Sequence, residues 1–463
     1  MKKEGFPFSQ VAAISGSGQQ HGSVYWNTGS QKVLKSLNKS SSLKTQLNNA
    51  FRIPDSPIWM DSSTTEQCLA LEKALGGAQS VASLTGSRAY ERFTGNQIAK
   101  IAKNDPKSYN ETERISLISS AMCSVLLGDY APIDTSDGCG MNLVDIKSLT
   151  WSNAILSHIG SNLQSKLGNT VVPSHQVVGT ISSYFRDVYG IPDSCKVVAW
   201  SGDNPNSVAG TGLRSPGDIA VSLGTSDTMF GITDKPTPGI EGHIFANPVD
   251  PKSYMAMLCY KNGSLTRERV RNESANSSWD AFNTVLTKTT KPGNDGHIGF
   301  YIDAPEITPA LKAGVRRFSP SGSGYKRVTS FSNPAHDVRA VVEGQFMSMR
   351  VHGESVGLTS PKRVIATGGA SGNAAIVQVL ADVFGAPVYV ASQTVTASLG
   401  AAYRALHGYV CESQGKFVPF ENVTGEAISS SLRLAASPRA DAHAAYSALL
   451  PAYKKCEAEV LAE

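Results

Sequence analysis

Three short apolar runs in the chain end abruptly in loops of small and polar residues. They cover residues 11–14, 197–199 and 364–366, and each is followed within three residues by glycine together with serine or threonine. Short runs of this kind are typical of buried strands in α/β sheets, where functional loops follow the carboxyl ends of the strands. The pattern therefore predicts an α/β fold with its chemistry in these loops.

Two further patterns predict the elements around glycine-rich turns. Apolar runs at 217–223 and 228–230 flank Gly224-Thr225-Ser226 and predict a β-hairpin with that turn. Residues 363–403 predict a strand, a glycine-rich loop, a helix that ends at Gly385, and a second strand. The apolar face of that helix, spaced at i, i+3, i+4, i+7 and i+8, is Ile376, Val379, Leu380, Val383 and Phe384.

The other segments give simpler expectations. Helical spacing predicts one helix over 112–128, ended by Gly128, and the tail from 427 to 463 is rich in Ala, Leu, Lys and Glu and predicts terminal helix. Residues 206–217 are rich in Gly, Asn and Ser and indicate a boundary. We therefore expect two domains, 1–208 and 209–463.

Composition narrows the class of protein. A chain of 463 residues is too long to fold around a single hydrophobic core. The net charge is only +4, from 42 Lys and Arg against 38 Asp and Glu, and the basic residues form no long run, so nucleic acid is not an expected partner. Seven scattered cysteines, never spaced as Cys-x-x-Cys, indicate reduced intracellular thiols. No run of 18 apolar residues and no signal region are present, so the cytoplasm is expected and a membrane span is not.

The loops carry no standard nucleotide motif. Neither the G-x-x-x-x-G-K-[ST] pattern nor a complete G-x-G-x-x-G is present. Backbone N–H groups in Gly-, Ser- and Thr-rich loops can receive phosphate oxygens, but Gly and Ser are also the usual residues of plain turns. Taken singly, each loop is open to both interpretations.

Asp203 is the strongest candidate for chemistry, because a carboxylate at the end of an apolar strand suits a catalytic base. The alternative is a helix N-cap or an Asx-turn. For His21 the alternative is a histidine satisfied by a backbone carbonyl, and for Arg88 and Arg92 a surface ion pair with Glu91. The segment Trp59-Met60-Asp61 could similarly be an aromatic anchor beside a cap.

Taken together, the pieces resemble the FGGY carbohydrate kinases, and the resemblance extends over nearly the whole chain. The matching segments are Gly18-Gln19-Gln20-His21-Gly22, Trp59-Met60-Asp61, Gly86 to Asn96, Gly202-Asp203-Asn204-Pro205, Ser222-Leu223-Gly224-Thr225-Ser226-Asp227, Glu241-Gly242-His243-Ile244-Phe245, Lys261-Asn262-Gly263-Ser264, Ala366-Thr367-Gly368-Gly369-Ala370 and Ala381-Asp382-Val383-Phe384-Gly385-Ala386-Pro387.

This resemblance implies an actin-like (ribonuclease H-like) α/β kinase of two domains, in which ATP with Mg²⁺ and a ketose, D-xylulose, meet in a cleft between domains. It implies that Asp203 is the base and that Gln20, His21, Arg92, Asp203 and Asn204 hold the sugar. The phosphate and adenosine residues that it implies are Gly224, Thr225, Ser226, Trp279, Gly369, Ala370 and Asn373.

The chain departs from the family pattern at its start. Family members open with a hairpin whose Asp helps hold Mg²⁺, whereas Met1 to Phe6 resembles the family's interior. We therefore expect an incomplete first domain, and we assign no residue to the metal. A non-catalytic protein that binds sugar or nucleotide, and a kinase for another ketose or polyol, remain alternatives. The sequence does not indicate the oligomeric state.

Overall fold

The computed structural model describes residues 2–160, 162–391 and 396–463. The chain forms two compact units: the first comprises Met1–Arg214, Pro238–Met255 and Val395–Ile428, and the second comprises Ser215–Thr237, Ala256–Thr394 and Ser429–Glu463. The boundary expected after residue 208 lies within helix α12 (Asp203–Thr211). Within the described ranges, no helix combines the length and the apolar character needed to cross a membrane.

The first unit brings the ends of two predicted strands together. Strand β1 (Ala13–Ile14) pairs in parallel with β8 (Lys196–Val198), and β7 (Val177–Thr180) pairs with the other edge of β8. Farther along, β2 (Ser17–Gly18) pairs in parallel with β9 (Ser201–Gly202), so that Gly18 lies opposite Gly202. Parallel strands end at the same edge of a sheet, and the loops after Gly18 and Gly202 therefore emerge side by side.

The prediction of one helix over 112–128 is wrong in its first half. Thr112–Leu117 is strand β4, antiparallel to β3 (Ser23–Asn27), and helix α7 covers only Ile118–Leu127 before Gly128. The Trp26 indole Nε1 donates to Ser116 Oγ at 3.0 Å across this pair. The spacing of apolar residues at 112–117 is compatible with either a helix or a strand. The segment forms a strand because it pairs with β3, about 90 residues earlier in the chain.

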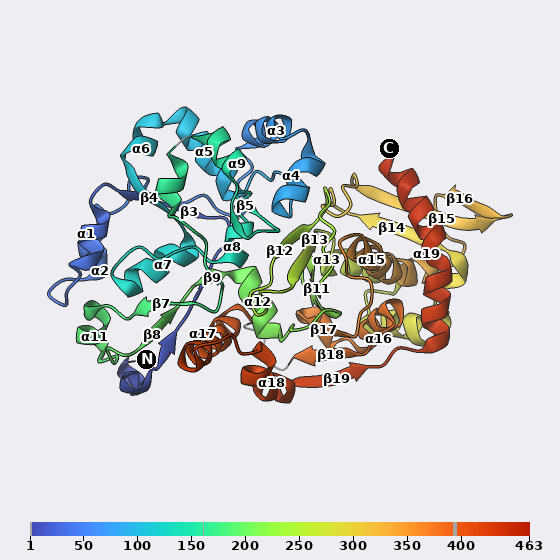
Figure 1. Ribbon diagram of the computed structural model, residues 1–463. Coiled ribbons are helices and arrows are strands. Elements are labelled where there is room, and N and C mark those ends of the chain that lie inside the picture. The colour runs from blue at the N-terminus through green and yellow to red at the C-terminus, as the bar shows by residue number, and fades with distance from the viewer. Residues whose placement is uncertain (1, 161, 392–395) are drawn as a thin grey trace. The chain divides into compact units, whose positions relative to one another are not determined.

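The segment expected as a boundary is helical from Asn206 to Thr211, and the two units divide in its later part, after Arg214. Helix α12 packs against α17 (Thr396–Gln414), beside which it runs in Figure 1. Glycines permit the contact: a Cβ added to Gly210 would lie 1.9 Å from Thr396 O, and one added to Gly400 would lie 1.8 Å from Asn206 O. The glycine content thus reflects close helix packing rather than a linker.

The second unit contains a large sheet, and the predicted elements around it are confirmed. Its strands run in the order β13, β11, β10, β17, β18 and β19. Their bounds are Tyr254–Tyr260, Asp227–Thr233, Asp218–Leu223, Arg363–Thr367, Val388–Ala391 and Leu432–Ala436, respectively. Strands β10 and β11 form the hairpin, while β17, helix α16 (Ala374–Phe384) and β18 form the strand-helix-strand unit. Positions 392–395 of the predicted segment lie outside the described residues.

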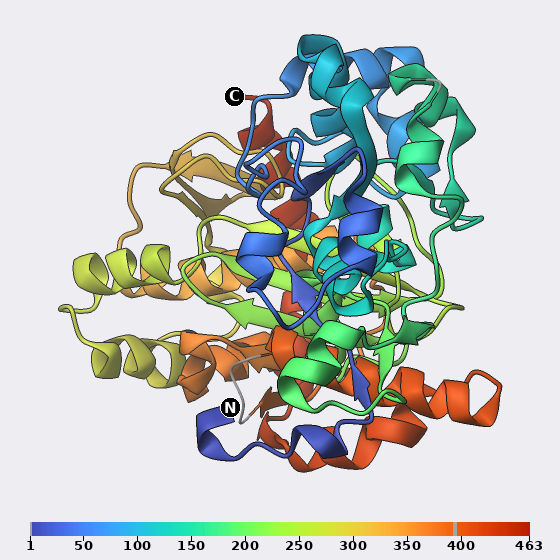
Figure 2. The same cartoon turned by 90° about the vertical axis from the view of Figure 1, so that its left-hand side faces the viewer.

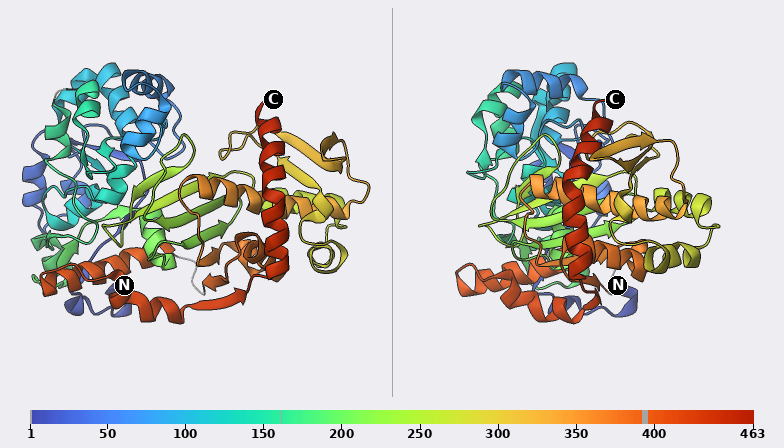
Figure 3. Two further views of the ribbon diagram at one scale, coloured as in Figure 1. Left: turned by 45° about the vertical axis from the view of Figure 1, so that its right-hand side comes forward. Right: turned by 90° about the vertical axis from the view of Figure 1, so that its right-hand side faces the viewer.

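Helices cover this sheet, and a smaller sheet lies beside them. Helices α15 (Ala335–Ser355), α16 and α19 (Ala440–Leu461) pack on one another, and α19 runs along the sheet of β14 (Ile298–Ile302), β15 (Gly314–Ser321) and β16 (Gly324–Val328), as Figure 3 shows. The tail is therefore not all helix. Strand β19 was missed because it is recognisable only by its antiparallel pairing with β18.

Candidate active site

Asp203 is the first residue of helix α12, directly after strand β9. Its Oδ1 accepts hydrogen bonds from the backbone N–H of Gln20 at 3.3 Å and of Asn204 at 2.9 Å, and from Asn204 Nδ2 at 3.3 Å. Its Oδ2 accepts none from any other described residue. Burial raises the pKa of Asp203, although these N–H groups oppose the effect. A half-buried carboxylate with one engaged oxygen and one open oxygen can accept a proton.

Gln20 joins Asp203 and Asn204 to a second, deeper carboxylate. Its Oε1 accepts from Asn204 Nδ2 at 2.8 Å, and its Nε2 donates to Asp137 Oδ1 at 3.2 Å. Asp137 also accepts from the Ser119 hydroxyl at 2.6 Å. Burial, together with the neighbouring Asp134, raises the pKa of Asp137 to about 7. The amide of Gln20 is thus fixed at both ends beside Asp203.

His21 follows in the same loop with a left-handed backbone (φ 72°). Its Nδ1 lies 2.9 Å from Gly140 O, so a backbone carbonyl satisfies this ring nitrogen. Burial and the nearby charge of Arg92 lower the pKa of His21 to about 3, and the ring, stacked on Phe93, is neutral. Because Nδ1–H donates to a carbonyl, Nε2 carries no proton and can accept from a ligand hydroxyl.

Arg92 is held by a histidine from a distant part of the chain. Its Nη2 lies 2.7 Å from Nε2 of His243, on strand β12 (His243–Ala246), and the Nδ1 of that histidine lies 3.1 Å from Ser87 Oγ. Burial lowers the pKa of His243 well below its usual value, so Nε2 accepts from the guanidinium. Arg88 pairs instead with Glu72, at 3.0 Å. The alternative interpretation, an ion pair of either arginine with Glu91, is not found among the described residues.

The segment 59–61 lies beside the glutamine loop. The Trp59 N–H donates to Gln19 Oε1 at 3.3 Å, and the Trp59 side chain is 54% exposed. Asp61 accepts from the Ser63 N–H at 2.9 Å and from Gln97 Nε2 at 2.7 Å. Asp61 therefore fixes the backbone ahead of α3 (Thr65–Ala74), while the exposed ring of Trp59 anchors nothing in the core.

In the second unit the predicted phosphate and adenosine loops lie at one edge of the sheet. Strand β10 leads into Gly224-Thr225-Ser226, and β17 leads into Gly368 to Asn373; the two strands are parallel, with Ser222 opposite Thr367. Thr225 and Ser226 are exposed, and their hydroxyls form no hydrogen bond with other described residues. Gly369 and Ala370 belong to a 3₁₀ turn that has no buried residue. Both loops thus present backbone groups outward.

Trp279 approaches this loop through its own helix. It begins α14 (Trp279–Thr284), in which Asn283 lies on the same face and accepts a hydrogen bond from Asn373 Nδ2 at 2.8 Å. The Oδ1 of Asn373 caps α16 by accepting from the N–H groups of Ala375 and Ile376. Trp279 is 37% exposed, so part of its ring is open to a ligand. The structure thereby brings Trp279 toward Asn373.

Sequence reasoning did not identify the residues behind the site, Asp137, Ser119 and His243. Asp137 is 117 residues from its partner Gln20 in the sequence, and His243 is 151 residues from its partner Arg92. The only local signal for Asp137 is a cluster of Asp, Thr, Ser and Gly at 134–138, which also describes an ordinary helix cap.

Comparison with known proteins identifies the class. The model of the FGGY family of carbohydrate kinases, N-terminal domain, matches residues 52–210, and that of the C-terminal domain matches residues 219–409. The chain therefore belongs to the FGGY family of carbohydrate kinases.

Relatives and solved structures agree with that assignment. The chain is 54% identical to the xylulose kinase of Mus musculus over 463 residues, covering 100% of this chain and 82% of the relative. It is 52% identical to xylulose kinase 2 of Arabidopsis thaliana over 427 residues, 90% of this chain and 76% of the relative.

Among solved structures, the chain matches xylulose kinase from Rhodospirillum rubrum with a TM-score of 0.77 and 15% identity, over 97% of this chain and 84% of that one. Gluconate kinase from Lactobacillus acidophilus matches with a TM-score of 0.75 and 18% identity, over 97% and 84%. The fold is thus the two-domain, actin-like α/β kinase fold, and the expected fold class is confirmed.

Proposed function

We propose that this protein transfers the γ-phosphoryl group of ATP to D-xylulose, giving ADP and D-xylulose 5-phosphate. The observation that carries the choice of sugar is the 52–54% identity to proteins named xylulose kinase over 90–100% of this chain. Structural likeness alone does not choose a sugar, because a gluconate kinase matches almost as well as a xylulose kinase.

Asp203 is the proposed base. It would accept the proton of the sugar O5 hydroxyl as that oxygen attacks the γ-phosphorus and the bond to the β-phosphate oxygen breaks. The open Oδ2 supports this role, because Oδ1 is already engaged by the N–H groups of Gln20 and Asn204. A raised pKa makes Asp203 a better proton acceptor than an ordinary surface aspartate.

The other hydroxyls of the sugar would meet Gln20, His21, Arg92 and Asn204. Gln20 and Asn204 are already bonded to each other at 2.8 Å, and His21 is fixed through Gly140. Groups held this way lose little side-chain entropy on binding. They also penalise a ligand that lacks the matching hydroxyl, because polar groups are then left buried and unpaired.

The nucleotide would bind the second unit. Backbone N–H groups of the Gly224-Thr225-Ser226 turn would receive phosphate oxygens, while Gly369, Ala370 and Asn373 would contact adenosine beside Trp279. The described residues contain no group of three or more His, Cys, Asp and Glu side chains arranged to hold a metal ion. Mg²⁺ would accompany the phosphates of ATP, and we assign it no side chain.

The direct test is a substrate panel. Purified protein is incubated with ATP, Mg²⁺ and, separately, D-xylulose, D-ribulose, D-fructose, gluconate and glycerol. ADP release is followed, and the product is identified by NMR. We expect the highest kcat/KM for D-xylulose, with the phosphate on O5. A higher value for another acceptor would replace the proposed sugar, and ADP release without a phosphorylated sugar would contradict kinase activity.

A further inference from the structure

The Gly224-Thr225-Ser226 turn is fixed from behind by a buried ion pair. Asp227 directly follows the turn and pairs with Leu223 in the hairpin. Arg267, on helix α13 (Ser264–Ser274), donates two hydrogen bonds to the Asp227 carboxylate: Nη1 to Oδ2 at 2.7 Å and Nη2 to Oδ1 at 3.1 Å. Both side chains are 0% exposed.

The N-terminus of α13 also touches the turn directly. The Ser264 N–H donates to Gly224 O at 2.9 Å. A Cβ added to Gly263 would lie 2.7 Å from both Asp227 Oδ1 and Thr225 O, so only glycine permits this approach. Turn and helix therefore form one tightly packed piece.

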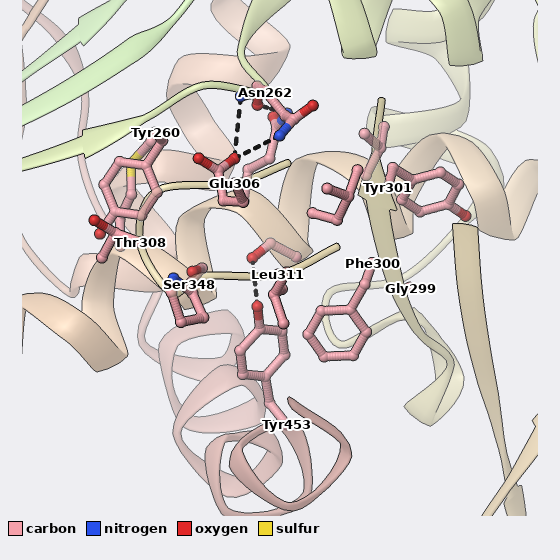
Figure 4. A pocket seen from close by; sticks show the side chains of 16 residues that line it. Tyr260, Asn262, Gly299, Phe300, Tyr301, Glu306, Thr308, Leu311, Ser348 and Tyr453 are labelled. Carbon is pink, nitrogen blue, oxygen red and sulfur yellow. Dashed lines mark hydrogen bonds between the residues drawn. The ribbon is translucent and has the colours of Figure 1, made fainter. Parts of the chain in front are cut away.

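A hydrogen-bond network continues behind Arg267. Arg267 Nη1 also donates to Gln345 Oε1 at 2.7 Å, and Gln345 Nε2 donates to Asn262 O at 2.8 Å. Asn262 in turn donates to Glu306 at 2.7 Å, as Figure 4 shows. The cavity beside Asn262 measures about 40 Å³, which is room for a few water molecules at most. The network has little space in which to rearrange.

The far end of the same helix contacts the proposed adenosine site. Arg271 lies one helical turn after Arg267, and its guanidinium carbon is 4.7 Å from the centre of the Trp279 ring. Helices α13 and α14 lie next to each other in Figure 2, where both are yellow-green. Helix α13 thus connects the turn to Trp279.

Stability alone does not explain a buried pair of this kind. Removing two charges from water costs several kcal/mol per ion, and apolar residues of equal volume often stabilise a fold as well. Arg267 Nε has no partner among the described residues, so the guanidinium is not fully satisfied. The bidentate ion pair with Arg267 does, however, fix the orientation of Asp227 and of the turn.

We propose that Arg267 and Asp227 are positioning residues for phosphoryl transfer: they hold the turn in the orientation that receives the phosphates of ATP. The proposal rests on the proposed function, because it takes the turn as the phosphate site. Neither side chain would touch the substrates. A displacement of the turn by about 1 Å would be expected to lower the rate by about 100-fold.

The test compares Arg267→Lys with a matched buried pair. Lysine retains the charge but cannot form the two parallel bonds. The control is Arg339→Lys, because Arg339 pairs with Glu343 at 2.9 Å, both are about 1% exposed, and neither contacts the turn. We expect Arg267→Lys to lower kcat by about 10- to 100-fold, to weaken ADP binding more than adenosine binding by calorimetry, and to leave KM for D-xylulose within about twofold.

Gln345→Met provides a second variant that leaves the ion pair in place if Arg267→Lys does not fold. It removes one support of Arg267 and should lower kcat in the same direction by a smaller factor. A parent protein that phosphorylates no sugar would refute the proposed function. In that case, equal weakening of ADP and adenosine binding by Arg267→Lys would overturn this proposal as well. With an active parent, equal losses of kcat in Arg267→Lys and Arg339→Lys, or a normal kcat in Gln345→Met, would overturn it.

Discussion

In the first unit, the groups proposed to meet the sugar are side chains held in place by hydrogen bonds, whereas in the second unit the groups proposed to meet the phosphates belong to an exposed turn. Gln20, His21 and Asn204 each have a fixed partner at 2.8–2.9 Å. The exposed hydroxyls of Thr225 and Ser226 have no partner among the described residues. Sugar hydroxyls differ between substrates and need side chains in fixed directions, while phosphate oxygens are alike and can be held by backbone N–H groups.

The buried carboxylates behind the two proposed sites also differ in the charges that surround them. The first unit buries Asp137 beside Asp134, and the shared negative charge adds to burial in raising the pKa of Asp137. The second unit buries Asp227 against Arg267, and that positive charge opposes the effect of burial. The two carboxylates behind the proposed sugar site thus share one buried cation, Arg404, which lies 3.8 Å from Asp134. Behind the proposed phosphate turn, the single carboxylate of Asp227 has its own buried cation, Arg267.

The largest expected effect is at the base. Asp203→Asn keeps the shape of the side chain but removes the proton acceptor, so kcat should fall by about 10² to 10⁴-fold. ADP binding, measured by calorimetry, should change little, because we propose the nucleotide site for the other unit. Asp105→Asn is the control, since Asp105 caps the N-terminus of α6 (Pro106–Glu111) and asparagine caps equally well. A kcat for Asp203→Asn within a few-fold of the parent would show that Asp203 is not the base.

The next effect separates sugar binding from ATP binding. Arg92→Met removes the guanidinium that lies against His243, and KM for D-xylulose should rise by about 10- to 100-fold because a charged hydrogen bond is lost. KM for ATP should stay within about twofold. Arg88→Met is the matched control, because Arg88 pairs with Glu72 and should leave both constants nearly unchanged. Parallel losses for sugar and ATP would mean that Arg92 supports the fold.

Elements with local sequence signals could be predicted, whereas elements defined by contacts with distant parts of the chain could not. The ends of strands and the helix at 374–384 were predictable, because a run of apolar residues, a cap and a glycine are local signals. Strand β4 and strand β19 were not, since each is defined by its pairing with a strand elsewhere in the chain. The same holds for Asp137 and His243, which reach Gln20 and Arg92 only after folding.

The turn itself was predictable and its support was not. Gly224-Thr225-Ser226 is visible as a hairpin signal, but nothing near Asp227 indicates that Arg267, 40 residues later, would grip it. Likewise, the glycines at 210 and 212 contributed to the predicted boundary, whereas Gly210 packs against Thr396 of α17, almost 190 positions away. Local composition cannot separate a flexible glycine from a closely packed one.

A third prediction concerns pH and stability. The pKa of Asp137 in the folded protein, about 7, lies above its ordinary value of 3.8, so the folded state binds this proton more tightly than the unfolded chain does. The stability gained is fully present below about pH 4 and is lost as the pH rises toward 7.

Asp137→Asn should remove this dependence. Between pH 5 and 7.5, the free energy of unfolding, measured by urea denaturation, should decrease in the parent by at least about 1 kcal/mol more than in the variant. Asp193→Asn, at an exposed position of the same unit, is the control and should behave like the parent. Identical slopes for Asp137→Asn and the parent would contradict a strongly shifted Asp137.

The smallest expected effect sharpens the contrast between side-chain and backbone recognition. If the phosphates are held by backbone N–H groups of the turn, Ser226→Ala and Thr225→Ala remove only a neutral hydroxyl, and kcat/KM for ATP should fall by no more than about threefold. The same truncation in the first unit, Asn204→Ala, removes a fixed partner of Gln20 and should raise KM for D-xylulose by about tenfold or more. Steady-state kinetics with both substrates varied measures each value. A loss above about 30-fold in Ser226→Ala or Thr225→Ala would place the recognition of phosphate in a side chain, and the distinction drawn between the two units would then no longer hold.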